Sequence, residues 1–201
     1  MRVNSQKTQL LCISATLNSG DSILESSDSM TLLGFNFSNR PTMSLHLELI
    51  KKKFNCRIWL IRHLKQAGLP QKDLATIFAT VIRPVIEYAA PVYHPLITSS
   101  QSEELEKMQR KTIKVIYGHR MSYRKALEEA AIPTLEERRQ NIFEKFTKKL
   151  VSNNGLKNWF PEQEAPKYAL RQTNKYKEYH ANTDPLFRSP LYTMRRLANK
   201  M

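Results

Sequence analysis

Side chains that suit contacts with nucleic acid are concentrated in residues 51–69, KKKFNCRIWLIRHLKQAGL. Lys and Arg bind phosphate oxygens, amides donate to the sugar–phosphate backbone, and an indole stacks on a sugar or a base. On a helical wheel one side collects these residues and has no acid after Glu48. We call this side the basic face, and it comprises Lys51, Lys52, Asn55, Trp59, Arg62, His63 and Gln66. We expect it to bind a nucleic-acid backbone, although Trp59 could instead pack against a neighbouring helix.

A long amphipathic helix must position the basic face. Ser44 is suited to cap its N-terminus, and Gly68 is suited to end it because glycine readily adopts a left-handed conformation. The sequence therefore predicts one helix over 44–68. Its apolar side recurs in three- and four-residue steps at Leu47, Ile50, Phe54, Ile58, Ile61 and Leu64.

Residues 70–155 continue with the period of helices. The first of these helices starts at Pro70, and we expect Pro84 and Pro91 to kink or divide it because each lacks a backbone donor. Two pairs have the spacing of a capping box, namely Ser100 with Glu103 and Thr134 with Glu137. The other predicted limits are Gly118, Ser122, Ala130 and Gly155.

Two apolar runs near the N-terminus, residues 9–14 and 30–37, have the composition of short strands. The sequence therefore predicts an α+β fold that is predominantly helical, with a short N-terminal β-hairpin, about five helices and a poorly ordered basic tail. The expected domains are 1–40, 41–155 and 156–201. The tail interleaves aromatic with basic residues, a composition that suits single-stranded nucleic acid or simply an ill-ordered segment.

Charge is distributed unevenly along the chain. Lys and Arg total 32 against 18 Asp and Glu, for a formal net charge of +14, and the whole excess follows residue 50. Such a surplus favours a polyanionic partner, of which nucleic acid is the first candidate and an anionic membrane the second. The alternative is a basic surface that only keeps the protein soluble. The two cysteines, Cys12 and Cys56, and the absence of a long apolar run predict an intracellular protein of the nucleus or cytoplasm, without a membrane.

Residues for metal or covalent catalysis do not form a known pattern. No two of the aspartates Asp21, Asp28, Asp73 and Asp184 are adjacent, and the five histidines are scattered. The sequence has no phosphate-binding glycine loop and no nucleophile elbow. We therefore expect no catalytic residue, no metal site and no cofactor.

Seven stretches, in this order, resemble the C-terminal part of the reverse transcriptase of non-LTR retrotransposons. They are RVNSQKTQLLCIS, LLGFNFSNRPTMSLHLELIKKKF, LIRHLKQAGL, FATVIRPVIEYAAPVYHPLIT, LEKMQRKTIKVIYG, YRKALEEAAIPTLEERRQNIFEKFTKKL and SPLYTMRRLANK. The resemblance covers essentially the whole chain. It implies that Asn4, Lys7 and Thr8 belong to the end of the palm, Leu33 and Gly34 to the hairpin that grips the primer, and the following helices to the thumb.

The same resemblance indicates what this chain lacks. Polymerases of this family carry an Asp-Asp motif that holds two metal ions, and the sequence begins just downstream of the place where it would stand. We therefore expect a non-catalytic, truncated fragment that binds RNA, DNA or an RNA–DNA hybrid weakly and with little sequence choice, and that could act with a missing polymerase core. The alternative is an independent helical module that binds RNA, DNA or a protein.

A second resemblance concerns only the stretch from Leu47 to Gly68. It is similar to the basic helical segment at the N-terminus of an AlkB-type tRNA-modifying protein that joins a dioxygenase to a methyltransferase. Such a dioxygenase needs two histidines and a carboxylate around iron. His46 and Glu48 are the only partial match and lie at the start of a predicted helix, so we expect neither activity.

Overall fold

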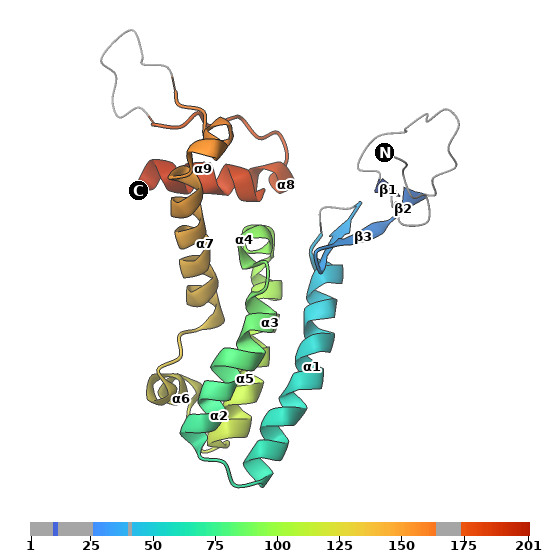
Figure 1. Ribbon diagram of the computed structural model, residues 1–201, viewed down its shortest axis with the longest axis vertical. Helices are drawn as coiled ribbons and strands as arrows, with labels where there is room; N and C mark the ends of the chain where they lie inside the picture. Colours follow the sequence, from blue (N-terminus) through green and yellow to red (C-terminus); the bar gives the residue numbers. More distant parts are fainter. Residues whose placement is uncertain (1–9, 12–25, 40–41, 164–173) are drawn as a thin grey trace. The chain divides into compact units, whose positions relative to one another are not determined.

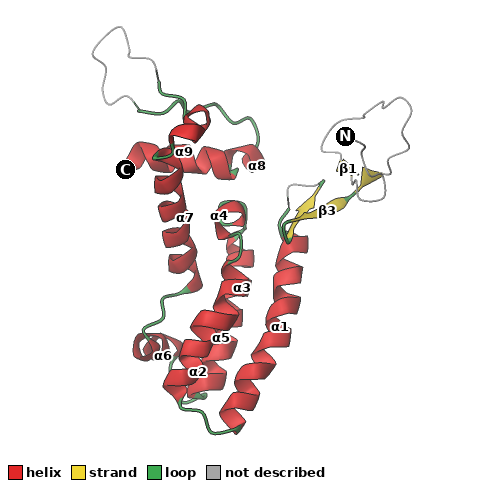
Figure 2. Ribbon diagram, viewed as in Figure 1, coloured by secondary structure: helices red, strands yellow, loops and turns green. Residues whose placement is uncertain are grey.

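The computed structural model describes residues 10–11, 26–39, 42–163 and 174–201. These residues are predominantly helical, with a small antiparallel strand pair toward the N-terminus, which confirms the predicted fold class (Figures 1 and 2). The chain forms two compact units, residues 1–52 and 53–201. The domain boundaries expected near residues 40 and 155 stay predictions. The expected palm residues Asn4, Lys7 and Thr8 lie outside the described residues.

A β-hairpin is the main feature of the first unit. Strand β3 (Ser29–Leu32) pairs with β4 (Phe35–Ser38) in antiparallel register. Leu33 and Gly34 form the turn, with φ angles of 50° and 77°. Positive φ at both central residues matches the twist of the flanking strands, and glycine supplies the second position without strain. The expected hairpin is thus confirmed, but both of its strands come from the second apolar run.

The first apolar run contributes a separate, shorter pairing. Strand β1 (Leu10–Leu11) pairs in parallel with β2 (Ser26–Ser27). The backbone N–H of Asn39 donates to the carbonyl of Asp28 at 2.9 Å, and its side-chain amide donates to the Asp28 carboxylate at 2.8 Å. These two bonds join the open ends of the β3–β4 hairpin.

Helix α1 (Ser44–Gln66) follows the hairpin and crosses from the first unit into the second between residues 52 and 53. Its N-terminal bound agrees with the predicted start near Ser44. Leu64 is half-buried, and the other five predicted apolar positions expose 3% or less of their surface: Leu47, Ile50, Phe54, Ile58 and Ile61.

The predicted stop of this helix is confirmed. Gly68 has a φ of 87°, and its N–H donates to the carbonyl of Lys65 while the N–H of Leu69 donates to that of Leu64. These paired bonds form a Schellman motif, which satisfies carbonyls that the helix leaves without a partner.

The helix predicted from Pro70 is divided, as its prolines indicate. Pro84 lacks the N–H that an α-helix would use, and the turn before it widens into a π-helix. Ala89, with φ of 56°, then separates two short helices, and Pro91 stands in the first turn of the later one. The pieces are α2 (Gln71–Ile77), the π-helix η2 (Phe78–Ile82), α3 (Arg83–Glu87) and α4 (Ala90–Tyr93).

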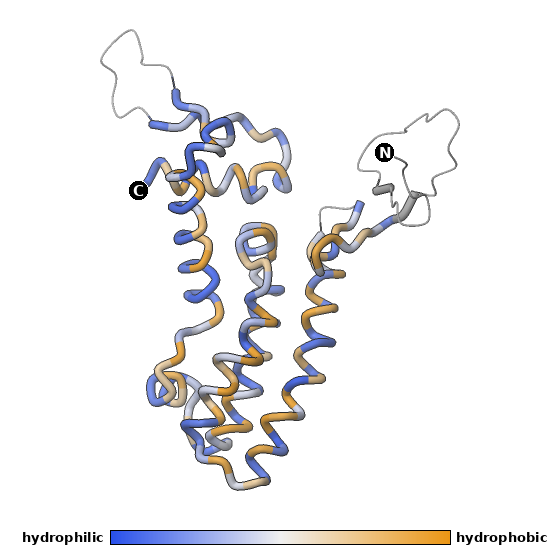
Figure 3. Tube along the Cα trace, in the orientation of Figure 1, coloured by the Kyte–Doolittle hydropathy of each residue, from blue (hydrophilic) through white to orange (hydrophobic). Residues whose placement is uncertain are grey.

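Three further helices complete the centre of the second unit: α5 (Ser99–Tyr117), α6 (Tyr123–Ala130) and α7 (Leu135–Val151). Helix α5 contacts α2, α6 and α7, and α7 also contacts α4. Apolar and polar residues alternate along α1 and α5 in Figure 3, as expected for helices with one buried side. Residues from several helices are fully buried in this core, among them Leu74, Phe78, Ile82, Ile86, Leu105, Ile113, Ile116 and Leu135.

The helix limits agree with the sequence except at two places. The caps at Ser122 and at Thr134 with Glu137 are present, and Gly118 ends α5. The capping box predicted at Ser100 and Glu103 is wrong, because α5 begins earlier and Thr98 with Gln101 forms the box. Gly155 does not end α7, which stops at Val151.

The C-terminal segment adds helices that the period of the sequence does not indicate. After the 3₁₀ helix η3 (Asn154–Trp159), the described residues contain α8 (Asp184–Phe187) and α9 (Pro190–Lys200). Helix α9 packs on α7, and an apolar cluster joins Phe143, Phe160, Tyr176 and Met194. The cluster draws each member from a different segment, so no local period predicts it. No helix within the described residues is long and apolar enough to cross a membrane.

Candidate nucleic-acid interface

The part of the basic face that belongs to the second unit is exposed. Asn55, Trp59, Arg62, His63 and Gln66 all lie on the solvent side of α1, opposite the buried apolar positions. The helix therefore presents the amides, the indole and the guanidinium together, because they recur at three- and four-residue steps.

Trp59 and His63 form a stacked pair on this side. Their ring centroids are 3.8 Å apart at an interplanar angle of 37°, and Nδ1 of His63 lies 3.0 Å from the carbonyl oxygen of Trp59. Trp59 keeps 58% of its surface exposed. More than half of the Trp59 surface is therefore open to solvent. The pair is an aromatic platform that faces solvent.

Three cations of α1 in the second unit have no acidic partner within the described part of the chain. None of the ion pairs there includes Lys53, Arg57 or Arg62, and each of the three is exposed. An exposed cation without a carboxylate nearby keeps its full charge available to an anion. Lys53 and Arg57 were not among the predicted residues. They lie beside the apolar positions on the helical wheel, so a search confined to the opposite side misses them.

Lys65 differs from these cations because it serves the fold. Its ammonium group donates to the carbonyl oxygens of Val115 at 2.6 Å and of Ile116 at 3.1 Å. Both carbonyls are in the last turn of α5, where a positive charge is favoured by the helix dipole. Lys65 thereby ties α1 to α5 within the second unit.

The remaining predicted residues belong to the first unit. Lys52 is exposed, whereas Lys51 is half-buried. Leu33, in the expected primer-grip stretch, exposes 84% of its surface in the β3–β4 turn, and Gly34 beside it is also exposed. The two residues thus lie in the turn at the tip of the β3–β4 hairpin.

Polar groups at the junction of α5, α6 and α7 are directed inward and form hydrogen bonds with one another. The hydroxyl of Tyr123 donates to one carboxylate oxygen of Glu106, whose other oxygen accepts from the N–H of Leu135 at 3.0 Å. The amide of Gln109 donates to Tyr123 and to the carbonyl of Pro133. Burial, reinforced by the bond to Glu106, raises the pKa of Tyr123 well above its ordinary value. This network stabilises the junction and offers no base or nucleophile to a substrate.

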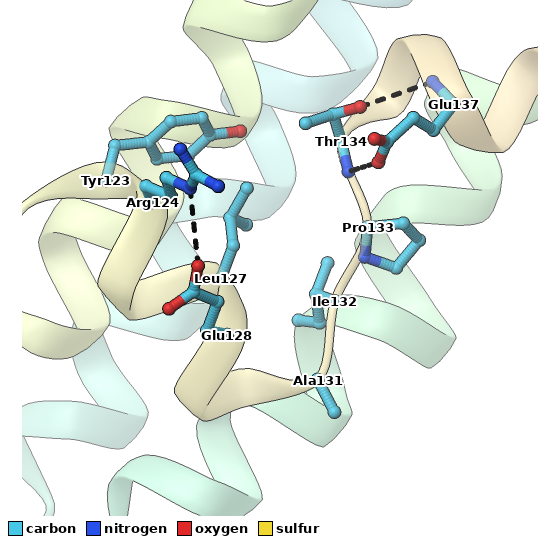
Figure 4. Close-up of a pocket in the computed structure, with 9 residues that line it drawn as sticks. All are labelled: Tyr123, Arg124, Leu127, Glu128, Ala131, Ile132, Pro133, Thr134 and Glu137. Atoms are coloured by element: carbon cyan, nitrogen blue, oxygen red, sulfur yellow. Dashed lines mark hydrogen bonds and ion pairs between the residues drawn. The ribbon is translucent and has the colours of Figure 1, made fainter.

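A groove lies beside this junction, and Figure 4 shows the side chains that line it. Helix α6 and the connection into α7 line it, with Leu127 and Ile132 as its apolar wall. Its polar side chains already have partners: Arg124 pairs with Glu128 at 3.3 Å, and Thr134 and Glu137 cap α7. The groove therefore lacks converging free groups that could perform chemistry.

Metal-binding geometry is also absent from the described residues, where no three His, Cys, Asp or Glu side chains lie together. His46, the partial match to an iron-binding triad, is buried in the first unit. Its ring packs on Phe35 with centroids 4.1 Å apart, and its Nδ1 accepts from the backbone of Asn36. His46 therefore has a packing role between α1 and the hairpin.

Comparisons of the chain with protein-family models, with curated proteins and with solved structures find no match.

Proposed function

We propose that this chain binds the sugar–phosphate backbone of nucleic acid through the basic face of α1 and catalyses no reaction. The observation that carries the proposal is the exposed Trp59–His63 platform beside Arg62, a cation that is itself exposed and forms no ion pair among the described residues. Cations supply phosphate contacts, amides supply sugar and phosphate contacts, and the indole packs on a sugar or base. Such a site tolerates many sequences, because none of these contacts reads base edges.

A membrane surface fits the same face less well. A helix that lies in a lipid interface needs a broad apolar side directed to the acyl chains. The apolar side of α1 is buried within the protein, and Trp59 is the single large apolar side chain on its exposed side in the second unit. The charge therefore suits a polyanion in solution better than a bilayer.

We further propose that the chain corresponds to the end of the palm and the thumb of a non-LTR retrotransposon reverse transcriptase. The seven resembling stretches support this origin, and so does the order of a hairpin with a Leu-Gly turn followed by a helical body. The ligand would then be a template–primer duplex, RNA–DNA hybrid included, in the nucleus or cytoplasm. A polymerase core with the Asp-Asp motif is the natural partner.

One observation favours the alternative of an independent RNA- or DNA-binding module. The second unit has its own buried core, its own helix caps and a C-terminal helix packed on α7. A unit with these properties can fold without a polymerase core. The genomic sequence upstream separates the two origins, because an in-frame or decayed Asp-Asp motif there favours the fragment.

The binding proposal can be tested at Trp59 itself. The chain has two tryptophans, so a Trp159→Phe variant reports on Trp59 alone. We expect a short RNA–DNA hybrid to quench Trp59 emission saturably at low salt, and Arg62→Ala to weaken this binding several-fold. Lys111→Ala is the matched control, because Lys111 is an exposed cation of α5. Unchanged Trp59 emission, or equal effects of the two substitutions, would overturn the proposal.

A further inference from the structure

The C-terminal segment holds a second set of exposed aromatic and basic side chains. Trp159 and Tyr179 expose 50% and 44% of their surfaces. In Figure 1, α8 and α9 lie at the opposite end of the second unit from the connection between α1 and α2. The C-terminal helices are therefore at the other end of that unit from the C-terminal end of α1.

Arg195 holds the two aromatic residues as neighbours. It exposes only 8% of its surface, its Nε donates to the carbonyl oxygen of Trp159 at 2.8 Å, and its guanidinium carbon lies 4.9 Å from the centre of the Tyr179 ring. A buried arginine that contacts both residues restricts their positions relative to each other. Arg195 therefore ties the backbone at Trp159 to the ring of Tyr179.

The segment that carries Tyr179 is also fixed to the rest of the unit. Two backbone hydrogen bonds join residues 161–163 to residues 175–177. The N–H of Gln163 donates to the carbonyl of Lys175, and the N–H of Lys177 donates to the carbonyl of Pro161, both at 2.9 Å. The Asn199 side chain of α9 accepts from the N–H of Tyr176 and donates to its carbonyl. The exposed rings thus stand on an anchored backbone.

Exposed lysines belong to the same segments as the two aromatic residues. Lys177 Nζ lies 5.6 Å from the centre of the Tyr179 ring, while Lys157 and Lys175 line an open hollow of about 590 Å³ beside η3. The carboxylate of Glu178 accepts from the amides of Asn174 and Asn199. Glu178 thereby has partners of its own, and Glu162 is the acid that lines the hollow with Lys157 and Lys175.

We infer that Trp159 and Tyr179, with these lysines, bind single-stranded nucleic acid by stacking on its bases. Exposed aromatic faces attract unpaired bases, because every base has a face to stack, and the nearby cations track the phosphates. A duplex hides its base faces, so it is the poorer ligand for this surface. The inference rests on the proposed function for its ligand class, nucleic acid, but it depends on a different set of residues.

Fluorescence of Trp159 tests the inference directly. In a Trp59→Phe variant, Trp159 is the remaining tryptophan. We expect oligothymidylate to quench it saturably at low salt, and Tyr179→Ala to weaken this binding about tenfold, the size of one lost base stack. Tyr179→Phe keeps the ring and should keep the affinity. Tyr88→Ala is the control, since Tyr88 is an exposed tyrosine of another segment.

Three results would overturn the inference. They are the absence of quenching by oligothymidylate, equal binding by wild type and Tyr179→Ala, and equal quenching by poly-aspartate, which carries charge but no bases. The last result, or capture of a protein instead, would make the surface a general anion or protein contact. Arg62→Ala should leave Trp159 quenching unchanged, so failure of the α1 proposal is distinguishable from failure of this one.

Discussion

The ammonium nitrogen of Lys65 lies 2.6 Å from the carbonyl oxygen of Val115, in the last turn of α5. This contact separates two roles among the cations of α1. Lys65 donates to carbonyls in the last turn of α5, which have no N–H partner within their own helix. Arg62, by contrast, pairs with no carboxylate among the described residues. Lys65 of α1 therefore stabilises the fold, whereas Arg62 of the same helix is available to a ligand at the surface.

Removing the charge of Lys65 should lower stability without altering binding. We expect Lys65→Met to reduce the free energy of unfolding by about 1 kcal/mol, because it deletes a charged donor at a helix C-terminus and keeps the apolar stem. Urea denaturation measures this change. Arg62→Met is the control and should change stability by less than about 0.5 kcal/mol. Equal losses in the two variants would contradict the division of roles.

The capping residues of α5 provide a second prediction. Thr98→Ala should cost about 1 kcal/mol of unfolding free energy, since the Thr98 hydroxyl accepts from the N–H of Gln101 at 3.2 Å. Ser100→Ala, two residues later, should cost less than about 0.5 kcal/mol, because it does not cap the helix. Thermal or urea unfolding compares them. A larger loss at Ser100 would place the helix start where the sequence alone suggested it.

The docking of the C-terminal helix is testable through Met194, which is 5% exposed. We expect Met194→Ala to cost about 3 kcal/mol, because it leaves a cavity in the cluster with Phe143, Phe160 and Tyr176. Hydrogen exchange should accelerate over α9, with Lys200→Ala as an exposed control. If α9 exchanges equally fast in wild type and variant, the segment does not pack as described.

Acid should destabilise the second unit through His94. Burial lowers the pKa of His94 below its ordinary value of 6.5, and the charge of Arg139 acts in the same direction. The hydrogen bond that His94 Nε2 donates to the side-chain oxygen of Gln140 and the charge of Glu136 oppose this shift but do not reverse it. The folded state therefore prefers the neutral ring, so stability is present above pH 6.5 and is lost as pH falls through the lowered pKa.

The measurement is urea unfolding across pH 7 to pH 5, the range about the ordinary pKa of histidine. His94→Gln keeps a neutral side chain and should flatten the decline, whereas the exposed His119→Gln should follow wild type. An unchanged pH profile in His94→Gln would show that another group carries the dependence.

Local signals in the sequence account for much of the fold. The period of Leu47 to Ile61 predicts the buried side of α1. Gly68 ends this helix, and Pro84 and Pro91 divide the next one, as their backbone conformations require. The same period predicts the exposed residues of the basic face, because they lie on the side of α1 opposite the buried positions. Trp59 is exposed as a base-stacking role requires, although the sequence left its packing open.

Features that depend on distant residues were not predictable in the same way. Met194 and Tyr176 reach Phe143 through tertiary packing, and a search for helical period does not detect a cluster drawn from separate segments. The role of Lys65 depends on the carbonyls of Val115 and Ile116, some 50 residues away. The start of α5 was misplaced because Thr98 and Ser100 both suit a cap, and the choice depends on where the preceding chain turns.

The most direct measurement of the central claim is binding of the full chain to a labelled RNA–DNA hybrid across a salt series. The compared proteins are wild type, a Lys52→Ala and Arg62→Ala double variant, and a control with Lys107→Ala and Lys111→Ala that removes the same charge from α5. We expect wild type to lose affinity steeply with salt and the α1 variant to lose about two units of that slope, one for each phosphate contact, with the control close to wild type. Failure of wild type to bind at low salt, or equal slopes for the two double variants, would contradict a nucleic-acid contact at the basic face of α1.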